Sequence, residues 1–195
     1  SNIPTIKAVK PYTPLELHGR DVYIQEGCVG CHSQMIRPFR AETERYGEYS
    51  KAGEFVYDHP FLWGSKRTGP DLQREGSAKL RKPNSWHFKH MYDPRSVSDG
   101  SIMPAYPWLL DKSYDTTMTA AKIRAMITLG VPYAEDYPEK ANADVVKQAN
   151  EIVEDMRALL EEDGFEVAPD REIVALIAYL QRLGRDIETK PTTDK

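Results

Sequence analysis

Cys28-Val29-Gly30-Cys31-His32 is the stretch that decides how this chain folds. Two cysteines separated by two residues and followed at once by histidine form the pattern by which a c-type haem is attached. The two thiols are spaced to add to the vinyl groups along one edge of a porphyrin, and the adjacent imidazole then lies beneath the iron as an axial ligand. The motif therefore predicts one covalently bound haem c, held by Cys28 and Cys31, with His32 on the iron.

A structural zinc site and a redox dithiol are the alternative interpretations of the paired cysteines. Zinc usually takes four protein ligands in a structural site, but the chain has no third cysteine, and its other histidines are His18, His59, His87 and His90. A thioredoxin-like dithiol follows a strand in a βαβ unit, whereas a helix-like segment precedes Cys28. Both alternatives are therefore less favoured than haem.

Composition is that of a globular, exported protein. The 195 residues are 40% hydrophobic and 29% charged, which is ordinary for a soluble fold. The net charge of −4 and the absence of a basic stripe argue against nucleic-acid binding. Because c-type haem is attached outside the cytoplasm, and the chain shows neither a signal peptide nor a run of about 18 apolar residues, we expect a periplasmic domain that has lost a leader or an N-terminal anchor.

Helix signals follow one another along the chain. Thr13-Pro14-Leu15-Glu16 is a capping box with proline at the first helical position, and Gly27 can end that helix in the left-handed region. Gly19 and Tyr23 on it would let a second helix approach closely. Further helices are expected at about 86–92, capped by Asn84 or Ser85, at 119–129, along the amphipathic stripe from Val145 to Leu159, and from Asp170 to Leu183. No strands pair convincingly, so the sequence predicts an all-α fold.

The residue opposite His32 decides what the iron can do, because methionine, histidine or an open position each give different chemistry. Met103 is the predicted sixth ligand, since it lies in an extended loop stiffened by Pro104 and Pro107. Met35 follows His32 too closely to reach the other face, and Met91, Met118, Met126 and Met156 fall in helical patterns typical of packing. His87 and His90, three residues apart on one helix face, are the rival ligands or partners of the haem propionates; His18 and His59 are expected to be structural or exposed.

The turn Thr68-Gly69-Pro70-Asp71-Leu72 is a candidate support for the proximal histidine. An imidazole ligand usually donates its free N–H to a carbonyl or a carboxylate, which fixes the plane of the ring. Pro70 offers a rigid carbonyl for this purpose, although an ordinary turn would have the same sequence.

These pieces together resemble a class I cytochrome c. In that family an N-terminal helix carrying glycine and an aromatic residue crosses a C-terminal helix, here Gly19 and Tyr23 against the segment from Leu176 to Leu183. The cysteine-histidine motif follows the first helix, a Gly-Pro-Asp-Leu turn supports the proximal histidine, and a Met-Pro pair supplies the distal ligand. All four features occur here in that order.

Three segments of the chain resemble one particular group of class I cytochromes c. Gly27 to Tyr46, Gly53 to Leu72 and Met103-Pro104-Ala105-Tyr106-Pro107-Trp108-Leu109 look like the monohaem cytochrome c subunit of cbb3-type cytochrome c oxidases. The resemblance is close over about residues 12–133. Residues 138–164 have the pattern of a generic amphipathic helix and add little to it. The resemblance implies a chain anchored on the periplasmic side of the bacterial inner membrane, through a helix that is absent from this sequence.

The same resemblance implies an electron relay, with no turnover by the chain alone. Electrons would arrive from a dihaem cytochrome c subunit or a soluble cytochrome c and leave for the catalytic haem-copper subunit of the oxidase, where oxygen is reduced in aerobic respiration. A free periplasmic electron carrier, a haem enzyme or gas sensor, and the monohaem subunit of a nitric oxide reductase remain alternatives.

The resemblance also divides the chain. We expect a linker at 1–11, a cytochrome domain at 12–187 with insertions at about 33–66 and 134–168, and a tail at 188–195. The aromatic-rich segment 33–63 is either an interface or a flap over the haem. Arg67 and Trp63 are candidates for contact with the haem propionates or edge, and Arg37, Arg40, Arg45 and Lys66 would neutralise propionates or meet an acidic partner.

Overall fold

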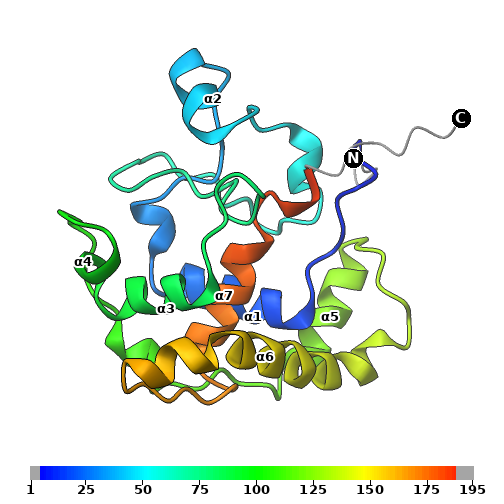
Figure 1. Ribbon diagram of the computed structural model, residues 1–195. Coiled ribbons are helices and arrows are strands. Elements are labelled where there is room, and N and C mark those ends of the chain that lie inside the picture. The colour runs from blue at the N-terminus through cyan, green and yellow to red at the C-terminus, as the bar shows by residue number, and fades with distance from the viewer. Residues whose placement is uncertain (1–4, 188–195) are drawn as a thin grey trace, which may run out of the picture.

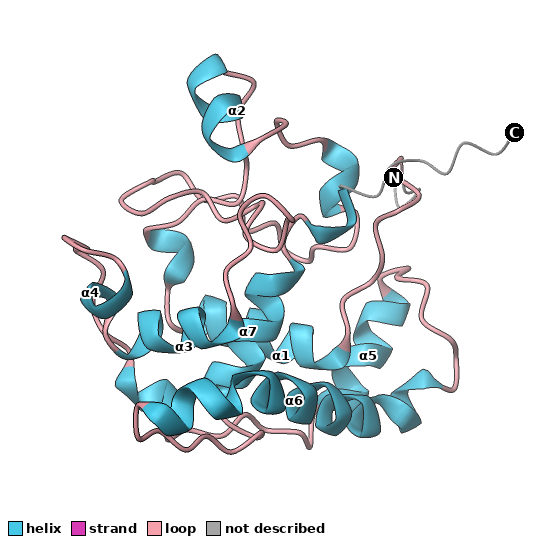
Figure 2. Cartoon of the chain, viewed as in Figure 1, coloured by secondary structure: helices cyan, strands magenta, loops and turns pink. Residues whose placement is uncertain are grey.

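The computed structural model describes residues 5–187, and its regular structure in that range is helical (Figure 2). Seven α-helices lie there: α1 (Pro14–Gln25), α2 (Arg40–Tyr46), α3 (Asn84–Tyr92), α4 (Pro94–Val97), α5 (Thr119–Thr128), α6 (Tyr137–Glu162) and α7 (Glu172–Arg182). Four 3₁₀ helices accompany them: η1 (Cys28–Gly30), η2 (Ala52–Phe55), η3 (Pro107–Leu110) and η4 (Arg185–Ile187). Extended pairing within residues 5–187 is limited to one bridge, between Ser113 and Arg171. The all-α prediction is confirmed.

Helix α1 begins and ends where its sequence signals predict. The backbone N–H of Glu16 donates to Thr13 Oγ1 at 3.3 Å, and the N–H of Thr13 donates to Glu16 Oε2 at 2.7 Å, so the capping box is complete. Gly27 follows the helix with φ of 73°, and η1 starts at the next residue. The cysteine motif is therefore fixed to the end of a capped helix.

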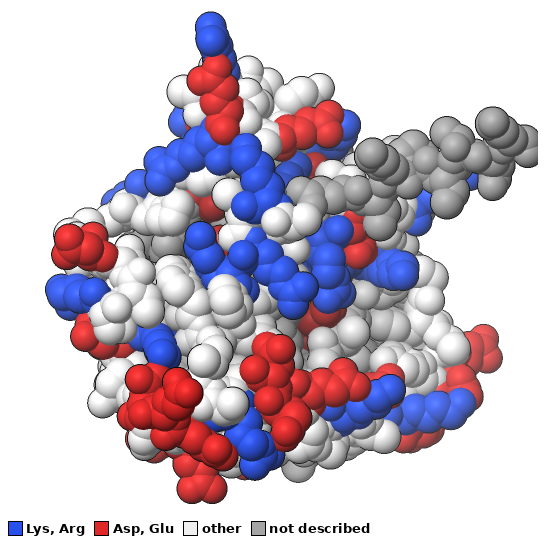
Figure 3. All heavy atoms as spheres, viewed as in Figure 1, with Lys and Arg blue, Asp and Glu red and all other residues white. Residues whose placement is uncertain are grey.

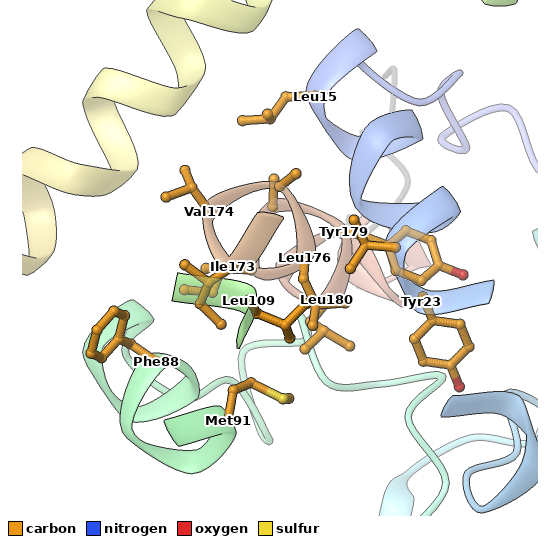
Figure 4. Packing of buried hydrophobic residues seen from close by; sticks show 14 of the residues in the cluster. Leu15, Tyr23, Phe88, Met91, Leu109, Ile173, Val174, Leu176, Tyr179 and Leu180 are labelled. Atoms are coloured by element: carbon orange, nitrogen blue, oxygen red, sulfur yellow. The ribbon is translucent and has the colours of Figure 1, made fainter. Parts of the chain in front are cut away.

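Helices α1 and α7 cross at the centre of the molecule (Figure 1). At the crossing, a Cβ atom on Gly19 would collide with the carbonyl of Ala175 and lie 2.8 Å from Cβ of Tyr179. Tyr23 and Tyr179 pack beside this contact with ring centroids 5.4 Å apart, as Figure 4 shows. The predicted close approach of these two helices is thus present.

Helix α6 runs along one edge of the molecule (Figure 1) and packs on the same core. Its buried stripe contains Val145, Ala149, Met156 and Leu160. The sequence pattern was expected to end at Leu159, but that side chain is 49% exposed, because the turn after Met156 brings Leu160 to the buried face. This helix therefore belongs to the core around α7.

The start of α3 differs from the prediction. The helix begins two residues early, after Pro83, without a side-chain cap. Asn84 does not cap it, because its amide donates to Asp155 of α6 at 2.8 Å and accepts from Gln181 of α7 at 2.9 Å. The asparagine joins three helices instead of ending one.

The segment between η1 and α3 is mostly loop, as its lack of periodicity indicates, and α2 projects from it (Figure 1). Part of the predicted N-terminal linker is packed, since Val9 is buried against Tyr57 and Val131. The predicted tail at 188–195 lies outside the described residues. Within those residues, no helix is long and apolar enough to cross a membrane.

Candidate functional site

A cavity of about 440 Å³ lies between the cysteine motif and the far side of α7. Its wall is built from the end of α1 and η1, the turn 68–72, α3, the loop 98–106 and two leucines of α7. Cys28, Cys31, His32 and Met103 all line it, and so do the apolar side chains of Leu72, Met91, Leu176 and Leu180. Figure 4 shows Leu176, Leu180 and Met91 in the packing of this region.

The two cysteines lie on the cavity wall and form no disulfide with each other. The tight turn of η1 brings them to one side, because the N–H groups of Cys31 and His32 both donate to the carbonyl of Cys28, at 3.1 and 2.9 Å. Cys28 is half-buried and Cys31 is exposed. Burial raises the pKa of the Cys28 thiol to about 12, so this thiol is protonated at neutral pH.

The imidazole of His32 is held by the predicted turn. Its Nδ1 lies 2.8 Å from the carbonyl oxygen of Pro70 and donates to it when it carries the proton. A Cβ atom on Gly69 would come within 2.7 Å of Nδ1, so only glycine lets the turn lie against the ring. Burial lowers the pKa of His32, which favours the neutral imidazole that binds metals.

The turn is fastened to the segment after His32 by several hydrogen bonds. The N–H of Gly69 donates to the carbonyl of Cys31 at 3.0 Å, and the N–H of Leu72 donates to that of Ser33 at 2.9 Å. Oδ2 of the buried Asp71 accepts from the Ser33 hydroxyl at 2.6 Å and from the N–H of Met35 at 2.9 Å. The Pro70 carbonyl is therefore fixed with respect to the histidine.

Arg67 and Trp63, which the sequence analysis placed at the propionates or the haem edge, do not line the cavity. Arg67 donates to the Ser33 hydroxyl at 2.7 Å and to the Met35 carbonyl at 2.6 Å, and it pairs with Glu42. Trp63 stacks on Phe61 with centroids 4.5 Å apart. No residue from 33 to 67 contributes to the wall, because Arg67 turns back onto the chain after His32 and supports it from outside.

Two of the six methionines reach the cavity, Met103 and Met91. Met103 is half-buried in a loop anchored to α3, where the N–H of Tyr106 donates to the carbonyl of Met91 at 2.7 Å. Leu109 of η3 is fully buried and fixes the other end of that loop. Met91 packs in the core cluster as a helical residue. Met156 is buried in the core away from the cavity, and Met118 is 53% exposed.

The rival histidines also line the cavity. His87 is 2% exposed, and neither its Nε2 nor Nδ1 of His90 has a hydrogen-bond partner. His90 stacks on Trp86 with centroids 4.5 Å apart. His18 is structural, since its Nε2 lies 2.9 Å from the hydroxyl of Thr119. Glu75 is a lining residue that the sequence analysis missed, because a single carboxylate beyond a turn carries no pattern.

A family model described as cytochrome c oxidase, mono-heme subunit/FixO, matches residues 1–187 of the chain. The chain belongs to this family. A comparison with curated proteins gives no match. Membership of the FixO family makes the protein the mono-haem subunit of a cytochrome c oxidase, an electron-transferring oxidoreductase complex. The family predicted from residues 27–46, 53–72 and 103–109 is thus confirmed.

The cavity fits the single haem that the FixO family name implies. It brings two thiols, an oriented imidazole and a thioether to one apolar space, which is the donor set of a c-type haem with histidine and methionine ligands. The unpartnered nitrogens of His87 and His90 are the buried polar atoms that a group with carboxylate arms would satisfy. Within residues 5–187, no group of three or more His, Cys, Asp or Glu side chains is arranged around a metal ion.

Proposed function

We propose that this FixO-family subunit is a one-electron relay whose haem is bound covalently through Cys28 and Cys31. The observation that carries the proposal is the meeting of both cysteines, His32 and Met103 on the wall of one cavity. When bound, the haem supplies one iron that changes between the ferric and ferrous states. All other parts of the mechanism are the work of the chain in binding, orienting and shielding that group.

His32 is the proposed proximal ligand. The Pro70 carbonyl fixes Nδ1 as the protonated nitrogen and leaves Nε2 as the donor. Gly69 sets how far the ring can rotate. Held by this turn, the imidazole would move little when the charge on the iron changes, which would keep the reorganisation small during electron transfer.

Met103 is the proposed distal ligand, in preference to Met91, His87 and His90. Its loop is anchored at Tyr106 and at Leu109, and the prolines at 104 and 107 limit the backbone between them. A thioether favours ferrous iron and raises the potential compared with a second imidazole. With His32 and Met103 both holding the group, the site would have no place for a substrate, so we expect no turnover by the subunit alone.

The proposed partners are the catalytic haem-copper subunit as acceptor and the dihaem cytochrome c subunit, or a soluble cytochrome c, as donor. The proposed location is the periplasmic side of the inner membrane. Phe61 is 54% exposed and Trp63 is 37% exposed on segment 33–63, which adds nothing to the cavity wall. Lys and Arg side chains also gather on the face drawn in Figure 3, at and below the position of α2. These features favour an interface over a flap.

Absorption spectra test the ligands. The purified protein should show a low-spin c-type spectrum in both oxidation states and a far-red methionine-to-iron band when oxidised, and it should not bind carbon monoxide when reduced. Met103→Ala should lose the far-red band and bind carbon monoxide. Met118→Ala, which removes an exposed methionine outside the cavity, is the matched control. Carbon monoxide binding by the native protein would reject the proposed Met103 ligand.

Reconstitution tests the relay. The reduced subunit, mixed with an oxidase complex from which it has been removed, should restore oxygen consumption driven by the dihaem subunit. Oxygen consumption that is equally fast without the subunit would favour a freely diffusing carrier.

A further inference from the structure

A recess of the cavity beside α3 holds three titratable side chains, Glu75, His87 and His90. Oε1 of Glu75 lies 3.8 Å from Nε2 of His87, and the Glu75 side chain is 15% exposed. Nε2 of His87 is buried and has no hydrogen-bond partner. The carboxylate arms of a haem would satisfy such a nitrogen, but they do not account for the mostly buried carboxyl group of Glu75 beside it.

Among residues 5–187, no lysine or arginine lines the cavity, so no cation of the wall pairs directly with a carboxylate. The nearest cations precede α3: the charge of Lys82 acts on both Glu75 and His87, and that of Arg81 acts on His87. On the α6 side, the charged groups are engaged elsewhere, Asp155 with Asn84 and Asp163 with Lys89. Helix α7 presents Leu176 and Leu180, and the remaining titratable residues of the wall are Tyr23, Cys28, Cys31, His32, Asp99 and Tyr106.

The chemistry of the recess follows from this burial. Burial raises the pKa of Glu75 to about 7, against the smaller opposite effect of Lys82. Burial also lowers the pKa of His87 to about 3, and the charges of His90, Lys82 and Arg81 act in the same direction. Near neutral pH, Glu75 is therefore the group that can exchange a proton, and His87 is a neutral neighbour able to accept a hydrogen bond.

We propose that Glu75, beside His87, is a proton-binding site coupled to electron uptake. The inference rests on the proposed function, that the cavity holds the haem. Glu75 takes one proton from solvent when the site gains one electron from its external donor, and it returns that proton when the electron leaves. The physical reason is that reduction removes one positive charge from the mostly apolar cavity, which destabilises the anion of Glu75 relative to its protonated form.

The test is the midpoint potential of the haem-containing protein, measured by spectroelectrochemical titration across the neutral pH range. At pH values between the pKa of Glu75 in the oxidised protein and its pKa in the reduced protein, the midpoint potential should fall as the pH rises. The slope should approach about 59 mV per pH unit, which is the potential change that corresponds to a tenfold change in the equilibrium constant of a one-electron couple. Glu75→Gln should remove this slope, whereas Glu75→Asp should keep it with a shifted midpoint. Glu172→Gln is the matched control, because burial also raises the pKa of Glu172 but that residue lies outside the cavity.

A slope that persists in Glu75→Gln would overturn the inference, since another group, such as a propionate, would then hold the proton. If Glu75→Gln and Glu75→Asp fail to fold, the native protein provides a second test that can overturn the inference without either variant. A flat potential, or an infrared redox difference spectrum without a carboxyl that gains a proton on reduction, would overturn it. Absence of the haem spectrum would instead defeat the proposed function, so the two failures are distinguishable.

Discussion

Position 69 has no room for a side chain, because the turn that contains it lies against the imidazole of His32. A Cβ atom there would meet three atoms of the ring, including Nδ1, the nitrogen that faces the Pro70 carbonyl. The sequence predicted the Pro70 contact from the way imidazole ligands are oriented, but it gave no reason for glycine beyond the turn itself. The reason is steric and becomes visible only when the two segments lie together.

Gly69→Ala is therefore expected to push the imidazole away from Pro70. Overpacking of this kind costs about 1–3 kcal/mol, which urea denaturation of the haem-containing protein would measure. The absorption bands of the haem should change as well, since the proximal ligand moves. Gly30→Ala is the control, because a Cβ atom there meets nothing within 4 Å; equal losses in the two variants would contradict the argument.

Helix α2 is connected to the proximal side of the cavity through a partly buried ion pair. Glu42 on this helix pairs with Arg67, which also donates to Ser33 and Met35 just after the proximal histidine. Arg37 pairs with the same carboxylate. The sequence analysis proposed Arg67 for contact with the haem propionates or edge, and that contact stays a prediction. The hydrogen bonds of Arg67 to Ser33 and Met35 could not be predicted, because the segment that carries them has no periodicity.

The free energy of unfolding should decrease in acid, because Glu42 becomes protonated. Although burial raises its pKa, the hydrogen bonds from Arg67 and Arg37 outweigh this effect and lower it to about 2. Because the pKa is lower in the folded than in the unfolded protein, the stabilisation is present at neutral pH. It is lost as the pH falls from the ordinary glutamate range, roughly 4.3, towards about 2.

Urea midpoints of the native protein and of Glu42→Gln, measured at several pH values, check this expectation. The native protein should be the more stable of the two at neutral pH, and the difference should shrink as the solution becomes acidic. Glu44→Gln, which alters an exposed carboxylate on the same helix, is the control. A constant difference between the native protein and Glu42→Gln at all pH values would show that the ion pair does not act in this way.

The crossing of α1 and α7 places Gly19 against the backbone of Ala175. Since backbone cannot swing aside as a flexible side chain can, Gly19→Ala should separate the helices and cost about 3 kcal/mol. Gln25→Ala, at an exposed position near the end of the same helix, should stay within about 0.5 kcal/mol of the native protein. Thermal or urea unfolding measures both, and a neutral Gly19→Ala would contradict the packing described here.

At the scale of the whole molecule, the longer helices could be predicted from local sequence signals, whereas the set of side chains that line the cavity could not. The capping box at Thr13, the glycine at 27 and the apolar stripe of α6 are local signals, so these helices could be predicted from the sequence. The short helices α2 and α4 were not predicted, because neither is long enough for an apolar stripe. Which side chains face the cavity depends on segments far apart in the chain. Glu75 and Met91 join the wall only because the turn after Pro70, α3 and the Met103 loop meet in space.

The central claim is that this subunit holds one haem covalently between the cysteine motif and the Met103 loop. The most direct test is the mass of the polypeptide, made in a host that attaches c-type haem and measured after complete unfolding, which releases any haem that is not covalently bound. The account predicts the mass of the chain plus one haem, and the mass of the chain alone for the Cys28→Ser, Cys31→Ser double variant. A native polypeptide that unfolds to the mass of the bare chain would contradict it.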